Sequence, residues 1–268
     1  MNRNISTSTS TARTAISSQV YHLGDQITVG FTQPDPPSVS KLLATTLQIL
    51  ILGASGRTGQ LTIASASKKG HTVTALVRNP STFTNPDPSK VTVVKGTPIS
   101  ETDIDAAFVS CPNTINAVIT TLAMPRTSEP PFGKPTAAPF FLRDVLKNTL
   151  AAMEKYGVKK IAIMSAFGAG NSWPPMSWLL KGMFSWTPMR YVVAEHDAVD
   201  GEVRKHEQLQ WTEARATMLK DGDQKSARKL GETGTGVKIM DSVTRAGLAE
   251  YLVDSVEGEG QGAVVIAN

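Results

Sequence analysis

Residues 48–59 join a strand-like run to a glycine-rich loop, and this segment constrains the fold more than any other. The run QILIL (48–52) is almost wholly apolar and leads directly into GASGRTG (53–59); a helix-compatible stretch (60–69) follows, and a second strand-like run begins at Thr72. Three glycines in this setting allow a tight turn, let the backbone approach a pyrophosphate, and let the helix pack closely on the strand. The segment therefore predicts a dinucleotide-binding βαβ unit.

Apolar runs of strand length alternate with helical stretches from residue 47 onward. This alternation is typical of βαβ units around a parallel sheet, which right-handed crossovers wind into one fold. We predict an α/β protein with a doubly wound parallel sheet, a Rossmann fold, in a single domain over residues 46–268. The predicted strands are Gln48–Leu52, Thr72–Val77, Val91–Val94, Thr114–Thr120, Ile161–Met164, Trp211–Ala214 and Ala263–Ile266.

The segment before this domain, residues 1–45, is predicted to be an N-terminal extension that is partly disordered. Residues 1–18 are rich in Ser and Thr and have almost nothing apolar to bury, which predicts a flexible tail. Residues 20–29 could form a short strand pair, and a proline cluster at 34–37 indicates a linker. The acid-free, Arg- and Ser-bearing start leaves a transit peptide as an alternative to a plain tail.

Composition narrows the cellular setting and the partners. The single cysteine, Cys111, excludes an internal disulfide and a cysteine-based metal cluster, which favours a reducing, cytoplasmic location, and we expect no metal site. The formal net charge of +4 is too small to indicate a nucleic-acid-binding surface. No apolar run approaches the roughly 20 residues that span a bilayer. We expect a cytoplasmic monomer or homodimer that binds a small-molecule substrate, with no nucleic acid or membrane as partner.

The residue that ends the second strand distinguishes the two nicotinamide cofactors. NAD enzymes usually place an Asp or Glu there to hold the ribose 2′-hydroxyl, whereas this chain has Arg78. A guanidinium favours a 2′-phosphate and stacks on adenine, and Arg57 in the glycine loop supplies a second cation. We predict NADP(H) as the cofactor; the alternative is that Arg78 is an ordinary surface residue.

Seven runs along residues 47–268 together resemble one family. Their order and spacing are similar to those of the atypical short-chain dehydrogenase/reductases, most of all the NmrA-like and flavin reductase/biliverdin-IXβ reductase branch, which includes reductase-like proteins of fungal polyketide pathways in secondary metabolism. The runs are ILILGASGRTG, GHTVTALVRNP, VTVVKG, NAVITTLA, GVKKIAIMSAFGAG, LQWTEARATML and DSVTRAGLAEYL.

The resemblance implies roles for particular residues of the cofactor site. Arg78 would take the 2′-phosphate. Leu122 and Ala123 would border the adenosine or the nicotinamide ribose. Ser165 and Ala166 would flank the nicotinamide. The residues implied to hold the pyrophosphate are Gly53, Ser55, Gly56, Arg57, Thr58 and Gly59.

Three positions depart from the family pattern. Thr97 stands where the family usually has Asp, which puts an adenine-side contact in doubt. Ala216 stands where Pro usually follows Arg215. Glu213 lies in a strand position that is usually apolar, and the sequence offers no physical reason for it.

Conventional members of the superfamily use a Tyr with a Lys four positions later, because the ammonium favours the ionised phenol. Tyr156 and Lys160 match this spacing but precede a strand, where Gly157 is a natural helix C-cap, so we interpret the match as accidental. Tyr191 lies nearer the right topological place and is a candidate catalytic residue. However, Glu195 rather than a lysine follows it by four positions, so the usual dyad is absent.

Two further catalytic candidates remain. Ser165 ends a central strand, where its hydroxyl could orient a substrate carbonyl or the nicotinamide amide, or simply satisfy the strand-end backbone. His196 lies on the apolar face of a predicted helix over 192–203, one turn before Asp200. A carboxylate there would hold the imidazole and raise its pKa, making a proton donor; the alternative is a structural, half-buried histidine.

Between Ser165 and this helix lies a stretch rich in Trp and Met, GAGNSWPPMSWLLKGMFSWTPM. It fits a lid over a flat apolar substrate, a core-packing helix or a dimer face. The first functional hypothesis is an NADPH-dependent reductase of a flat conjugated molecule such as a flavin, quinone or polyketide-type metabolite. The alternatives are a non-redox isomerase or cyclase, and a dinucleotide-sensing regulator, which the absence of a deep pocket would favour.

Overall fold

The chain divides into two units, residues 1–45 and 46–268. In the first unit, β1 (Tyr21–Leu23) and β2 (Gln26–Thr28) form an antiparallel pair, within the stretch where a strand pair is predicted. The predicted tail, residues 1–18, and the proline cluster lie outside the described residues. The computed structural model describes residues 21–23, 26–28, 46–111, 113–128 and 132–268.

The second unit is built on an eight-stranded sheet in the order β10-β12-β8-β7-β6-β3-β4-β5. Every neighbouring pair is parallel except β10 with β12. The chain starts in the middle at β3, moves outward through β4 and β5, then crosses to β6 and continues the other way. The predicted doubly wound Rossmann fold is confirmed. The strands are β3 (Gln48–Leu52), β4 (Thr72–Val77), β5 (Val91–Lys95), β6 (Ala117–Thr120), β7 (Lys160–Ala166), β8 (Gln210–Ala216), β10 (Arg228–Lys229) and β12 (Gly262–Ala267).

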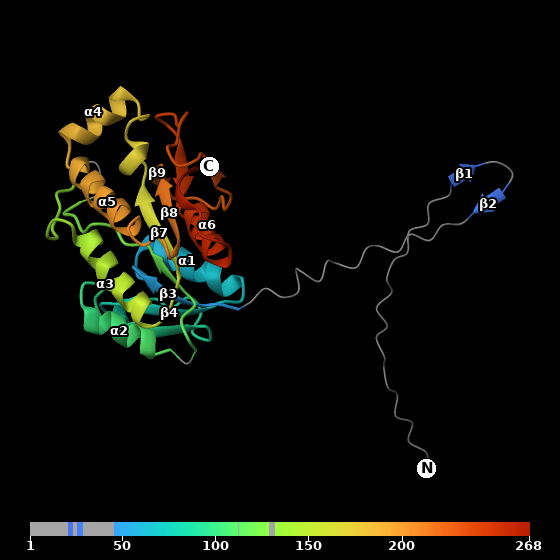
Figure 1. Ribbon diagram of the computed structural model, residues 1–268, viewed down its shortest axis with the longest axis horizontal. Coiled ribbons are helices and arrows are strands. Elements are labelled where there is room, and N and C mark those ends of the chain that lie inside the picture. The colour runs from blue at the N-terminus through green and yellow to red at the C-terminus, as the bar shows by residue number, and fades with distance from the viewer. Residues whose placement is uncertain (1–20, 24–25, 29–45, 112, 129–131) are drawn as a thin grey trace, which may run out of the picture. The chain divides into compact units, whose positions relative to one another are not determined.

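Helices cover both faces of the sheet, as Figure 1 shows. One face carries α1 (Arg57–Lys68) and α6 (Arg245–Glu257), which pack against each other. The other face carries α2, α3 and α5, and α4 packs on α5. Their bounds are α2 (Glu101–Val109), α3 (Phe141–Lys155), α4 (Trp178–Trp186) and α5 (Met189–Val203).

Two 3₁₀ turns and two short strands also belong to this unit. The 3₁₀ turn η3 (Gly170–Ser172) follows β7, and a second 3₁₀ turn, η2 (Pro80–Thr82), follows β4. Strands β9 (Met218–Lys220) and β11 (Ser242–Thr244) pair in parallel as a separate small sheet.

The hydrophobic core forms two layers because side chains alternate along each strand. In β3, Ile49 and Ile51 pack toward α1 and α6, whereas Leu50 and Leu52 pack toward α2 and α3. All four are fully buried. This alternation explains why a strand with helices on both faces is apolar at every core position.

The Trp- and Met-rich stretch after β7 divides between packed and exposed residues. Met176 is buried in a small cluster with Phe167 and Val265. In contrast, α4 has no buried residue, and Trp178 and Trp186 are 83% and 89% exposed. Leu180 and Phe184 of α4 pack half-buried against the same cluster, so α4 lies at the edge of the core, and the lid and the dimer face remain predictions.

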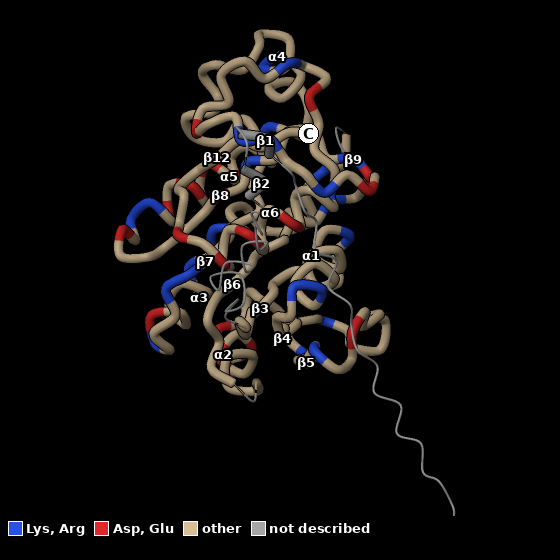
Figure 2. The backbone as a smooth tube through the Cα atoms, turned by 90° about the vertical axis from the view of Figure 1, so that its right-hand side faces the viewer, with Lys and Arg blue, Asp and Glu red and all other residues tan. Residues whose placement is uncertain are grey.

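Charge is distributed without a dominant sign. Figure 2 shows Lys and Arg mixed with Asp and Glu along the backbone. None of the helices in the described part of the chain is long and apolar enough to cross a membrane.

Candidate functional site

The glycine loop joins β3 to α1 in a conformation that needs its glycines. Gly53 has φ of +86°, and a Cβ on it would lie 2.9 Å from the Thr121 carbonyl carbon. A Cβ on Gly59 would overlap the Gly53 carbonyl oxygen and lie 2.9 Å from the Ala54 Cα. Gly56 is the N-cap of α1 and offers no side-chain cap to the first-turn amides. The loop thus forms a side-chain-free cradle at a helix N-terminus, which fits a pyrophosphate.

The cradle lies at the point where the chain direction across the sheet reverses, between β3 and β6. The hydroxyl of Thr121, which follows β6, lies 3.2 Å from the carbonyl oxygens of both Leu52 and Gly53 and donates a hydrogen bond to them. Leu122 and Ala123 follow directly. Open α/β sheets bind ligands in the crevice at such a switch point, so the loop and the β6 end are positioned for one dinucleotide.

Two arginines lie close to the cradle along the chain, one at the end of β4 and one at the start of α1. Arg78 follows β4 directly and is exposed, while Arg57 is the first residue of α1. The Arg57 guanidinium lies 3.7 Å from Asp221, which also pairs with Arg245 at 2.7 Å. Asp221 therefore offsets part of the positive charge at Arg57, a contact from a distant segment that the sequence did not indicate.

A buried charged network lies at the carboxyl ends of β7 and β8. Ser165 and Arg215 are partners in the register of these strands, so their side chains share a face of the sheet. Arg215 is fully buried. Its Nε donates to Glu213 Oε2 at 3.1 Å, and its Nη2 donates to Asp200 Oδ1 at 2.7 Å. The sequence does not explain why Glu213 stands in an apolar strand; in the structure it is a buried ion-pair partner of Arg215.

The network extends from the sheet to α5 and the surface. Asp200 also accepts from Arg204 Nε at 2.8 Å, and Arg204 pairs with Glu232 at 2.6 Å. Arg215 further donates to the Asn171 side chain and to the Glu232 carbonyl oxygen. Burial raises the pKa of Glu213 to about 7, even though the Arg215 charge and the Ser165 hydroxyl act in the opposite direction.

His196 occupies a different environment from the predicted one. Burial, followed by the charges of Arg126 and Arg215, lowers its pKa to about 4. Asp200 bonds to arginines instead of the imidazole, because a guanidinium gives it stronger charge-assisted bonds. The prediction that Asp200 holds the imidazole and raises its pKa is wrong; a catalytic role for His196 stays a prediction.

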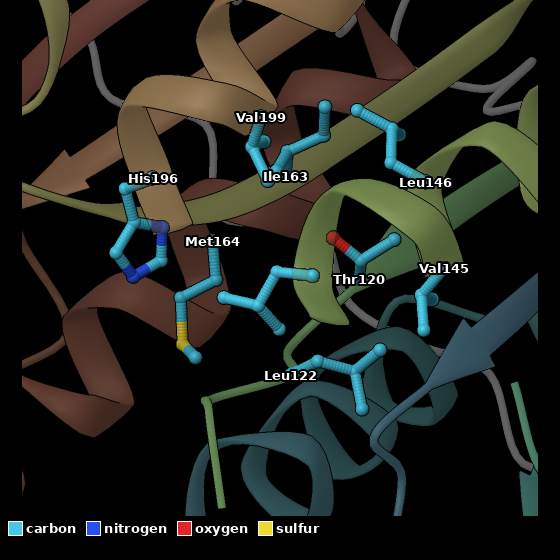
Figure 3. A pocket seen from close by; sticks show the side chains of 9 residues that line it. Thr120, Leu122, Val145, Leu146, Ile163, Met164, His196 and Val199 are labelled. Atoms are coloured by element: carbon cyan, nitrogen blue, oxygen red, sulfur yellow. The ribbon is translucent and has the colours of Figure 1, made fainter. Parts of the chain in front are cut away.

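The imidazole borders a small apolar cavity between α5, α3 and the ends of β6 and β7, drawn in Figure 3. Its volume is about 20 Å³, which is room for about one water molecule. Leu122 and His196, two predicted site residues that are far apart in the sequence, both line this cavity. The lining residues are Thr120, Leu122, Leu142, Val145, Leu146, Ile163, Met164, His196 and Val199.

Tyr191 is not among the residues that line this cavity. It is exposed near the start of α5, and its hydroxyl accepts from Arg190 Nη2 at 3.0 Å. Glu195 serves the fold: its carboxylate accepts from the backbone amides of Phe140 and Leu142, which caps the N-terminus of α3. A catalytic role for Tyr191 remains a prediction that these contacts do not support.

The accidental Tyr–Lys match lies at the amino end of β7, away from the glycine loop. Tyr156 stacks on Phe108 with ring centroids 5.0 Å apart. Lys160 Nζ donates to the Gly258 carbonyl oxygen at 3.0 Å. The interpretation of this pair as structural is confirmed.

The lowered pKa of His196 predicts an acid-sensitive fold. Unfolded chains bind a proton at this histidine near pH 6.5, whereas the folded protein resists protonation down to about pH 4. The contribution of His196 to the free energy of unfolding is therefore fully present above pH 6.5, and it decreases by about 3 kcal/mol as the pH falls to 4. Urea unfolding of His196→Gln should lose this part of the pH dependence, and His206→Gln, at a partly exposed site, is the control. Parallel stability curves for wild type and His196→Gln would contradict the prediction.

Comparisons with known proteins agree with this geometry. The sequence profile described as NAD(P)H-binding matches residues 53–259. The solved structure of ChuY, an anaerobillin reductase from Escherichia coli, has a TM-score of 0.62 at 21% identity, over 82% of this chain and 96% of that chain. A short-chain dehydrogenase/reductase from Veillonella parvula, in complex with NADP, has a TM-score of 0.62 at 19% identity, over 83% and 94%. At these identities the likeness shows a shared fold.

The profile covers the glycine cradle, both β6 and β7 ends and the buried network, so the site lies inside the matched region. The profile confirms the NAD(P)H-binding family that the predicted resemblance implies, and the solved structures share its fold. By its sequence profile and its Rossmann fold, this chain belongs to the NAD(P)H-binding family.

Proposed function

We propose that the protein is an NADPH-dependent reductase of a flat, conjugated, weakly polar molecule such as a flavin, quinone or polyketide-type metabolite. The observation that carries this proposal is the position of the glycine cradle beside Ser165 and an apolar cavity, at one end of one sheet. A nicotinamide held by the cradle would reach the β7 end, where a substrate would meet mostly aliphatic side chains. The reductase name of ChuY and the NADP complex of the Veillonella protein support the same reaction class.

NADP(H) supplies a hydride when bound, so the protein's own part is to position the reactants and provide a proton. The cradle amides would hold the pyrophosphate, and Ser165 would hydrogen-bond the substrate or the nicotinamide amide. His196 is neutral at physiological pH because its pKa is about 4. It is therefore suited to contact an apolar ring and poorly suited to donate a proton.

Cofactor preference is tested at Arg78. Arg78→Ala should weaken NADPH binding by about 5- to 150-fold, because it removes a charge-assisted hydrogen bond worth about 1–3 kcal/mol. NADH binding should change much less, since NADH lacks the 2′-phosphate. Titration calorimetry with both cofactors measures this, with Arg228→Ala, in β10 at the far edge of the sheet, as the control. An equal loss for both cofactors would remove Arg78 from 2′-phosphate recognition.

The activity is tested by mixing the protein with NADPH and flavins, quinones or aromatic ketones, and following the reduced nicotinamide absorbance. We expect oxidation with at least one acceptor, faster with NADPH than with NADH. Ser165→Ala should slow it, because the hydroxyl that would orient the substrate or the nicotinamide is lost. Tight NADPH binding without oxidation by any acceptor would contradict the reductase proposal.

One observation favours a second candidate, a dinucleotide-sensing regulator. The cavity beside the predicted nicotinamide position holds about 20 Å³, far below the 300–1,000 Å³ or so of typical ligand pockets. A regulator would bind NADP(H) and a partner protein without turnover. The acceptor panel separates the two candidates, since only the reductase oxidises NADPH.

A further inference from the structure

Unpartnered polar atoms gather at one place in the protein. Within the described residues, the buried side-chain atoms without a hydrogen-bond partner are Ser67 Oγ, Ser165 Oγ, His196 Nδ1 and Glu213 Oε1. All but the first belong to the ends of β7 and β8 and the adjoining turn of α5. Folded proteins leave few buried polar groups unpaired, so such a cluster indicates a site that acts on a ligand or a proton.

Glu213 and Ser165 lie on neighbouring strands at successive positions of one face. Glu213 is opposite Ile163, whereas Ser165 is opposite Arg215, two residues closer to the carboxyl ends of β7 and β8. The side chains lie on the same face, and the Ser165 hydroxyl is near enough to act on the Glu213 pKa, although neither Ser165 Oγ nor Glu213 Oε1 completes a hydrogen bond in this structure. Glu213 Oε2 is fixed by Arg215, which leaves Oε1 as its open oxygen. The arrangement places a buried carboxyl and a buried hydroxyl on one face of the sheet, with the hydroxyl nearer the carboxyl end of β7.

Charge balance explains how this carboxyl keeps a proton. The guanidinium groups of Arg215 and Arg204 contact three carboxylates, those of Glu213, Asp200 and Glu232. With all three ionised these five groups have an excess negative charge, which is costly for the buried carboxylate of Glu213 because it lies away from water. One proton restores neutrality. The titratable and charged groups around Glu213 are Arg215 on β8, His196, Asp197 and Asp200 on α5, Arg204 at its end, Glu232 after β10, and Arg126, which acts on His196.

Glu213 is the member best placed to keep this proton. Its side chain is fully buried, whereas Glu232 reaches the surface and Asp200 contacts two arginines. Burial is the largest influence on its pKa, which rises to about 7, and the nearby Asp200 carboxylate adds to the rise. Geometry and charge therefore agree on the protonated group.

We propose that Glu213 stores a proton and delivers it through the Ser165 hydroxyl to the substrate, an inference that rests on the proposed reductase function. NADPH would supply the hydride when bound, and reduction of the substrate would leave an electron pair on a substrate heteroatom. That heteroatom takes the proton of Ser165 Oγ while Ser165 takes the proton of Glu213, so Ser165 ends unchanged. Glu213 remains as a carboxylate paired with Arg215 and regains a proton from solvent after the product leaves. One hydride and one proton are consumed per turnover.

Infrared titration tests the stored proton without substrate or cofactor. Wild-type protein should show a protonated carboxyl C=O band that disappears as the pH rises through about 7. Glu213→Gln should lack the band, and Ser165→Ala should shift its frequency because the nearby hydroxyl is lost. Glu250→Gln is the matched control, since Glu250 also contacts a serine hydroxyl, Ser65 at 2.9 Å, on the opposite face. A wild-type spectrum without the band overturns the proposal, even if the protein is an active reductase.

Kinetics with the best acceptor from the panel test the use of the proton. Wild-type turnover should fall about tenfold per pH unit above pH 7 or so, as expected for a required acid. Glu213→Gln should lower turnover by about 10²-fold and flatten the pH profile, with NADPH affinity unchanged. Ser165→Ala should act similarly, and the double variant should be no slower than either single one. An unchanged pH profile in Glu213→Gln, or multiplicative losses in the double variant, overturns the path. No turnover in wild type overturns the reductase function and this use of the proton with it, while the infrared band would still reveal the stored proton.

Discussion

Replacing Arg215 by methionine should lower the free energy of unfolding by about 3–5 kcal/mol, the usual loss when one partner of a buried ion pair is removed. Methionine keeps much of the volume, so the loss reports the charge. Arg215 is fully buried between Glu213 and Asp200. Without the guanidinium, Glu213 on β8 loses its ion-pair partner, whereas Asp200 on α5 keeps its contact with Arg204. Guanidinium chloride unfolding of the purified variant measures the effect.

The matched control is Arg204→Met. Arg204 contacts Asp200 and Glu232, but its side chain is 38% exposed, and pairs of this kind contribute about 1 kcal/mol or less. The loss in the Arg215 variant should shrink as the pH falls below 7, because protonation removes the Glu213 charge that the guanidinium would neutralise. Glu213→Leu in the Arg215→Met background should recover part of the stability. Equal losses in the Arg215 and Arg204 variants would show that the buried network does not stabilise this edge of the sheet.

Replacing Gly59 by alanine should weaken NADPH binding by about 100-fold, the equivalent of losing one or two charge-assisted hydrogen bonds. The added Cβ would overlap the Gly53 carbonyl oxygen and approach the Ala54 Cα at 2.9 Å. Both neighbours are backbone atoms, so the loop must move away from the N-terminus of α1. The amides that would hold the pyrophosphate then lose their alignment. Calorimetric titration with NADPH measures the change.

Gly201→Ala is the control for the same chemical change. Gly201 lies inside α5, and a Cβ there meets nothing within 4 Å. This variant should keep its cofactor affinity and gain about 0.5–1 kcal/mol of stability, since alanine favours a helix interior over glycine. Normal NADPH affinity in Gly59→Ala would show that the glycine loop is not the pyrophosphate site.

The strands show where local pattern suffices. Runs such as Gln48–Leu52 and Thr72–Val77 have the same bounds in the structure as in the prediction. Strands β7 and β8 extend two residues further than predicted, to Ala166 and Ala216. Those extra residues include Ser165 and Arg215. Because both are polar, the apolar pattern stops before them, although the strand pairing continues through them. Strand β10 escaped prediction because its two charged residues, Arg228 and Lys229, have no strand pattern of their own.

The sequence by itself determined the fold class, the glycine cradle and the candidate ends of the strands. These depend on neighbours along the chain: apolar periodicity, the spacing of three glycines, and the order of strand and helix. The sequence shows Glu213 only as a charged residue in an otherwise apolar strand. It does not reveal that Arg215 is the partner of this carboxylate in the folded protein.

Tertiary structure alone decided which charges meet. Asp200 lies one helical turn from His196, yet it bonds to Arg215, fifteen residues away along the chain and on a different element. The pKa of a buried group depends on the burial and on every charge within a few ångströms, and those charges come from strands and helices that only folding brings together. For that reason the sequence assigned a raised pKa to His196, whereas the folded protein lowers it and raises the pKa of Glu213.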